Sequence, residues 1–199
     1  MKKLILLGVL AMALPIGAFA NSQVDFSNSG GKVTGSSSKG LTLNGSTLLA
    51  VNGLNGGALI TGNNLGSVSF TTGKLISGSI KTGGVFAGGG SFVITGNGSN
   101  GVPSGVLFAG TFSGPITWQL LTSPTGIHSY VLAGTLLSTS GGVSGATTQL
   151  TFDTGTHFFN GSARLSGGTT TVVPEPGTLS LLGTGILGLA GLVRHKLKS

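Results

Sequence analysis

Five side chains in the middle of the chain have the chemistry needed for acid–base catalysis or metal binding: Asp25, His128, Tyr130, Asp153 and His157. Glycoside hydrolysis needs two carboxyl groups flanking the bond to be cut, and here that pair would be Asp25 and Asp153. A Ser-His-Asp arrangement could use Asp153 and His157, but no Gly-x-Ser-x-Gly sequence marks a nucleophile elbow. Two histidines and an aspartate without ligand spacing are a weak metal signal. We therefore predict a protein that is not an enzyme, with no catalytic residue, no metal and no cofactor.

The positive charge of the chain gathers at its two ends. The net charge of +7 would by itself favour a nucleic-acid partner. Residues 21–171, however, contain five basic and two acidic side chains, a difference of only +3. The five are scattered, so they form no patch that could neutralise a row of phosphates. We therefore expect no nucleic-acid partner. The basic residues at the ends are Lys2, Lys3, Arg194, Lys196 and Lys198.

The first 20 residues have the three parts of a secretory signal peptide. Lys2 and Lys3 precede an apolar run at 4–14, which leads to the small residues Ala18 and Ala20. We expect signal peptidase to cut after Ala20. A retained membrane anchor is the weaker alternative, because the apolar run is short and is broken by a proline and a glycine.

Residues 21–171 are predicted to be an exported domain rich in glycine, serine and threonine. The chain has no cysteine, so this domain depends on burial and backbone pairing instead of disulfides. No apolar pattern of helical period survives for three turns. Disorder is the competing interpretation because glycine, serine, threonine and asparagine dominate the composition and the charge is very low, and we expect it most at residues 21–40.

Short runs rich in valine, isoleucine, threonine and phenylalanine predict strands throughout this domain. The fold class is therefore predicted as all-β, an antiparallel β-sandwich or a flattened barrel of many short strands. A solenoid is the alternative. The predicted strands are 32–34, 41–44, 47–51, 58–61, 66–72, 74–81, 85–87, 91–95, 106–113, 116–121, 128–138, 147–153 and 162–166.

Several features of the domain admit both a structural and a functional interpretation. Trp118 could stack on a sugar, but it shares a strand side with Ile116 and Leu120 and is predicted to lie in the core. Asn-Gly pairs begin at residues 44, 52, 55, 97, 100 and 160 and are interpreted as hairpin turns, even where a serine follows as in a glycosylation sequon. Threonines at 147–148 and 169–171 suggest an ice-binding face, but no regular threonine ladder recurs along the sequence.

The last 28 residues, 172–199, combine a rigid turn, an apolar segment and a basic end. Pro174 and Pro176 flank Glu175, and neither a helix nor a strand can run through that turn. A helix is predicted at 178–193, and it reaches a marginal membrane span because Arg194 and the lysines beyond it can extend to the interface. A buried core helix is the alternative, disfavoured because the segment has no polar face.

This order of features resembles the PEP-CTERM sorting signal of exported bacterial proteins, also catalogued as an ice-binding protein C-terminal domain. The resemblance rests on Val-Pro-Glu-Pro-Gly at 173–177, the leucine- and glycine-rich run, and Arg194. It implies recognition of Pro174, Glu175 and Pro176 by an exosortase that removes the tail, whose basic end is Arg194, Lys196 and Lys198. The basic end departs from a solid arginine run.

The resemblance also implies a destination. It predicts an inner-membrane-associated precursor, held by its tail until cleavage, and then a structural or adhesive protein in the cell envelope or extracellular polysaccharide matrix of a Gram-negative bacterium. Exopolysaccharide is thus an expected partner, beside signal peptidase and exosortase. The alternatives are a secreted carbohydrate-binding or carbohydrate-active protein and a surface protein that stays anchored in the membrane.

Overall fold

The computed structural model describes residues 23–139 and 143–174, and Ser22–Val173 form one compact unit. The predicted signal peptide at 1–20, with Ala18 and Ala20, lies outside the described residues. So do the predicted helix at 178–193, Glu175, Pro176, Arg194, Lys196 and Lys198. None of the described segments is a helix with the length and apolar character needed to cross a membrane.

The described part of the chain is all-β, as predicted, with one short 3-10 turn at Leu54–Gly56. Its strands are β1 (Val24–Ser29), β2 (Lys32–Ser36), β3 (Gly40–Asn52), β4 (Ile60–Thr71), β5 (Leu75–Ser79), β6 (Gly83–Phe86), β7 (Gly89–Asn97), β8 (Ser104–Phe112), β9 (Ile116–Thr122), β10 (His128–Ser138), β11 (Val143–Gly155) and β12 (Ser162–Pro174).

Eight strand positions close into a barrel. Around it the order is β1, β3, β4, β7, β8, β10, β11 and β12, and β12 pairs again with β1. A solenoid, the alternative prediction, is wrong, because the ladders between these strands are antiparallel and the first strand closes the barrel by pairing with the last. The flattened barrel is the prediction that comes nearest to this topology.

At two of the eight barrel positions, two consecutive strands lie end to end and the chain bends between them. β1 and β2 pair with β12 in one continuous register, with Val24 opposite Val172 and Lys32 opposite Arg164. Between β1 and β2 the chain bends at Gly30 and Gly31, whose φ angles of 71° and 80° suit glycine. β8 and β9 likewise lie end to end along β10. Outside the barrel, β9 also pairs with β6, and β6 pairs with β5.

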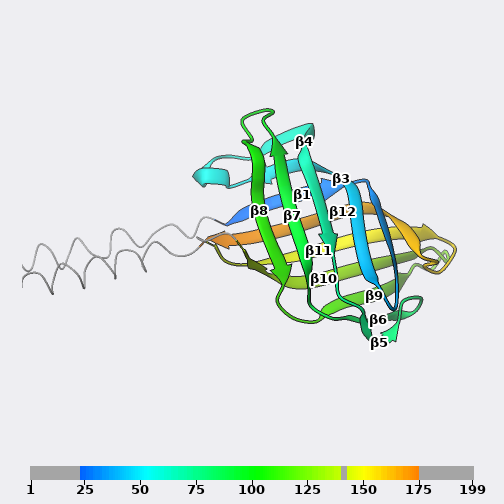
Figure 1. Cartoon of the computed structure of the whole chain (residues 1–199). Helices are drawn as coiled ribbons and strands as arrows, with labels where there is room; N and C mark the ends of the chain where they lie inside the picture. Colours follow the sequence, from blue (N-terminus) through cyan, green and yellow to red (C-terminus); the bar gives the residue numbers. More distant parts are fainter. Residues whose placement is uncertain (1–22, 140–142, 175–199) are drawn as a thin grey trace, which may run out of the picture. The chain divides into compact units, whose positions relative to one another are not determined.

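The bends divide the barrel into two layers whose strands cross. Figure 1 shows β3, β4, β7 and β8 running across β1, β12, β11, β10 and β9. Crossed layers need corners where strands pass from one layer to the other, and bulges supply them. The bend between β1 and β2 and the break between β8 and β9 are such corners.

The space between the layers is filled by apolar side chains that alternate along each strand. Phe70, Phe92, Phe108 and Phe112 form one aromatic cluster, with ring centroids 6.0–6.3 Å apart. A second cluster surrounds Trp118, which is 1 % exposed, so the core interpretation of this residue is confirmed. Its other members are Tyr130, Phe152 and Phe159. Burial of these apolar side chains stabilises the fold of a chain that has no cysteine and therefore no disulfide.

Four predictions about local structure were wrong, and one of them is the pair of strands at 58–61 and 66–72, which form the single strand β4. Residues 21–40 were expected to be the most disordered part, but they contain β1 and β2, and Val24 and Phe26 are buried. β1 was not predicted as a strand because polar residues alternate with its few apolar ones. The strands at 41–44 and 47–51 are one strand, and Asn44-Gly45 lies inside it as a bulge instead of at a hairpin turn. Glycine bulges let strands run through points where composition predicts a turn.

Candidate functional site

The two carboxylates that could have formed a hydrolytic pair lie far apart. Asp25 on β1 accepts a hydrogen bond from the Thr171 hydroxyl at 2.7 Å. Thr171 on β12 lies beside Thr147 on β11, since the hydroxyls of the adjacent residues Thr170 and Thr148 are 2.9 Å apart. Asp153 comes six residues after Thr147 on β11, which corresponds to about 20 Å at ~3.4 Å per residue. This distance is too large for two carboxylates acting on one glycosidic bond.

The histidines do not form a metal site with Asp153. His128 Nδ1 lies 3.0 Å from the Thr122 hydroxyl, and its ring stacks on Phe158 with centroids 4.4 Å apart. Asp153 instead accepts a hydrogen bond from Ser129 Oγ at 2.8 Å. His157 is exposed in the turn between β11 and β12. Across residues 23–139 and 143–174, no group of three or more potential ligands comes together.

Tyr130 has a structural role that sequence reasoning did not identify. Its ring stacks on Trp118 with centroids 4.7 Å apart. Its hydroxyl donates a hydrogen bond to the Lys81 carbonyl at 2.5 Å and accepts one from the Phe159 amide at 3.0 Å. Trp118 Nε1 donates to the Ile80 carbonyl at 2.9 Å. The two aromatic side chains thus hold the β5–β6 turn and the β11–β12 turn against the barrel.

The one predicted sorting residue within the described part, Pro174, ends β12. Two residues before it, Val172 is buried and pairs with Val24 near the start of β1. The strand therefore extends to the first proline of the motif, although residues 172–174 were predicted to belong to the tail alone.

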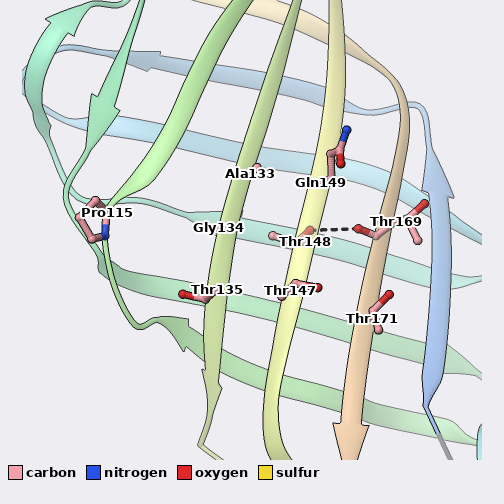
Figure 2. A pocket seen from close by; sticks show the side chains of 9 residues that line it. All are labelled: Pro115, Ala133, Gly134, Thr135, Thr147, Thr148, Gln149, Thr169 and Thr171. Carbon is pink, nitrogen blue, oxygen red and sulfur yellow. Dashed lines mark hydrogen bonds between the residues drawn. The ribbon is translucent and has the colours of Figure 1, made fainter.

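The outward side chains of β11 and β12 form a polar surface, which we call the β11–β12 face: Thr147, Gln149 and Thr151 from β11, and Thr169 and Thr171 from β12. Figure 2 shows Thr135, Thr147 and Thr171 at one level on three neighbouring strands, with Gln149 and Thr169 further along. Folding thus creates a row of threonines, although the sequence contains no regular ladder of them.

Three hollows follow one another along this face. One, of about 490 Å³, is lined by Thr135, Thr147, Gln149, Thr169 and Thr171 together with backbone and small residues of β10. A second of about 490 Å³ adjoins it toward Leu137 and Val173. A third of about 660 Å³ lies on the other side, over Thr151, Ser166, Gly167 and Gly168. The absence of a side chain at Gly167 leaves the surface open there, because a Cβ at this position would meet no atom within 4 Å, whereas a Cβ at Gly168 would meet buried Leu150.

The sequence alone suggests an ice-binding face at the threonines 147–148 and 169–171, an interpretation that was set aside because no regular ladder recurs along the sequence. The alternation of polar Thr147, Gln149 and Thr151 with apolar Leu150 and Phe152 indicates a strand with one wet side. Which strands lie beside β11 depends on the topology, and sequence alternation carries no information about that.

One segment of the chain matches a known protein family. Residues 172–194 match the family model described as the PEP-CTERM protein-sorting motif. No curated protein and no solved structure matches the chain. The match begins at Val172, so the motif and the last barrel strand share residues 172–174. The chain therefore carries a PEP-CTERM protein-sorting motif, the mark of an exported protein that is processed by an exosortase.

Proposed function

We propose that the mature protein is a non-enzymatic structural or adhesive component of the cell envelope or of the extracellular polysaccharide matrix of a Gram-negative bacterium. One observation carries this proposal: the sorting motif begins within the closing strand of a barrel whose outward side chains are mainly hydroxyl and amide groups. Such a surface hydrogen-bonds to neutral polymers without requiring a charged partner.

The processing steps follow from the two ends of the chain. Signal peptidase cuts after Ala20, close to the start of β1 at Val24. The segment at 178–193 and the basic residues after it hold the precursor in the membrane while Pro174, Glu175 and Pro176 are recognised. Exosortase then removes the tail and releases the barrel to the envelope or the matrix.

The intact mass of the protein recovered from an exporting host tests this proposal. The wild-type protein is expected to lack both the first 20 residues and the tail. The triple change Pro174→Ala, Glu175→Ala and Pro176→Ala should retain the tail and stay in the membrane fraction. A wild-type mass that still includes residues 179–199 would show that the tail is not removed, and would favour the permanently anchored alternative.

The carbohydrate-active alternative is disfavoured by the distance between Asp25 and Asp153. A direct check is the hydrolysis of neutral and anionic polysaccharides by the purified protein, measured as the release of reducing ends. Activity that Asp25→Asn or Asp153→Asn removes would contradict the non-enzymatic assignment. Activity that neither change affects would point to a contaminating enzyme.

A further inference from the structure

We infer that the β11–β12 face is a binding site for a neutral polysaccharide chain. This inference rests on the proposed function and assigns its adhesive role to one surface of the barrel. The hollows over β11 and β12 form a continuous track, since Thr135, Thr147 and Thr171 line both hollows of about 490 Å³ and Gln149 and Thr169 line both the first hollow and that of about 660 Å³.

The first step of the argument is the hydrogen-bonding state of this face. Within residues 23–139 and 143–174, the side chains of Thr147, Gln149, Thr151 and Thr169 have no protein partner, although the Thr151 and Thr169 carbonyls accept hydrogen bonds from Ser166 and Thr148. Three of these four side chains are exposed. Each hydroxyl can both donate and accept, as can the amide, which matches the hydroxyl groups of a sugar.

The second step is the contrast with the outward side chains of β4 and β7, which we call the β4–β7 face. There Ser67 and Thr95 lie 2.7 Å apart, and Thr71 and Ser91 lie 3.1 Å apart. The smaller hollow of about 350 Å³ beside them is also lined by Asn97, whose amide donates to the Asn64 carbonyl at 2.9 Å. Polar groups already bonded to each other gain less from a ligand, because binding exchanges one hydrogen bond for another.

The third step is charge. The central part of the β11–β12 face has no ionised side chain. Asp25 lies at its edge and is bonded to Thr171 and to Gln23. Asp153 and Arg164 lie toward the far ends of β11 and β12, next to the turn that joins them. An anionic polymer would find no compensating cation along the track, so a neutral chain fits this surface better.

The test uses the processed protein purified from an exporting host and its electrophoretic retardation in native gels that contain a polysaccharide. The probes are hydroxyethyl cellulose and dextran as neutral polymers and alginate as an anionic one. The triple variant Thr147→Val, Thr151→Val and Thr169→Val removes three hydroxyls and keeps β-branched side chains suited to a strand. The matched control, Thr47→Val, Thr71→Val and Thr95→Val, makes the same change on or beside the β4–β7 face.

We expect retardation by at least one neutral polymer, a loss of affinity of about tenfold or more in the β11–β12 variant, and little change in the control. Gly167→Leu gives a second variant, because a Cβ at this position meets no atom within 4 Å. It should fill the hollow, weaken binding and leave the thermal unfolding temperature nearly unchanged.

Three results would overturn the inference: no retardation by either neutral polymer, stronger retardation by alginate, or an equal loss of affinity in both triple variants. A failure here is distinguishable from a failure of the proposed function. A protein that loses its tail and is recovered in the matrix fraction, but that binds neither neutral polymer, refutes this site alone. A protein that keeps its tail and still binds dextran refutes the sorting proposal alone.

Discussion

The two layers of the barrel have similar polar compositions on the outside but differ in how their side chains are held. In the layer of β3, β4, β7 and β8, the core is a phenylalanine cluster, and the hydroxyls on the β4–β7 face bond to each other. In the layer of β9–β12, the core contains hydrogen-bonded Trp118 and Tyr130. Among the described residues, four of the five outward side chains of the β11–β12 face have no protein partner, whereas Ser67, Thr71, Ser91 and Thr95 on the β4–β7 face are paired with one another.

We expect the phenylalanine cluster to contribute most to the stability of the first layer. Phe92 is fully buried and contacts the rings of Phe70, Phe108 and Phe112. Phe92→Ala should therefore lower the free energy of unfolding by about 3–5 kcal/mol. Urea denaturation followed by tryptophan fluorescence measures the loss. A change below about 1 kcal/mol would mean that this cluster repacks and that the contrast between the cores is overstated.

The two layers also differ in how closely the backbones of neighbouring strands approach at a glycine. Gly66 on β4 has φ +151°, and a Cβ there would lie 1.8 Å from the Thr95 carbonyl oxygen on β7. Gly66→Ala should lower the free energy of unfolding by about 2–3 kcal/mol, because the backbone of one strand must move away from the next. Gly167→Ala on β12 is the matched control and should change it by less than about 0.5 kcal/mol, since that position is open.

The second layer should depend measurably on buried hydrogen bonds. Tyr130→Phe removes the hydroxyl and leaves the Lys81 carbonyl and the Phe159 amide without this partner, while the aromatic stack with Trp118 remains. We expect the free energy of unfolding to fall by about 2 kcal/mol. Amide hydrogen exchange at Phe159 should rise in the same variant. An unchanged exchange rate would indicate that the ring stack alone holds the β11–β12 turn.

The smallest effect is expected on the outer surface. Thr147→Val removes an exposed, unpaired hydroxyl and should change the free energy of unfolding by less than about 0.5 kcal/mol. Thr95→Val breaks the pair with Ser67 and should be slightly more costly. Parallel thermal unfolding of the two variants measures the difference. The reverse order would indicate that Thr147 has a structural partner and is not open to a ligand.

Much of the fold follows from local sequence. The run from His128 to Ser138 is rich in residues that favour strands, and both of its ends were predicted correctly. The placement of Trp118 in the core followed from Ile116 and Leu120 on the same strand side. Strand lengths were underestimated at β3 and β12, because glycines inside those strands have the composition of turns.

The closure of the barrel and the candidate face could not be predicted in this way. Both depend on which strands are neighbours, and β1 pairs with β12 from the other end of the domain. The row of Thr135, Thr147 and Thr171 exists only once that topology is formed. The sorting motif was the opposite case, since its information is contained in a short contiguous segment.

The pairing of β1 with β12 also orders events in time. Asp25 and Thr171, which meet through a 2.7 Å hydrogen bond, are separated by 146 residues. In a chain that crosses a membrane from its N-terminus onward, β1 and β2 therefore lack their partner β12 until that last strand emerges. Contacts of such long sequence separation form slowly, and unpaired strand edges invite aggregation. Because the sorting motif begins at Val172, within β12, the strand that closes the barrel and the start of the motif emerge together.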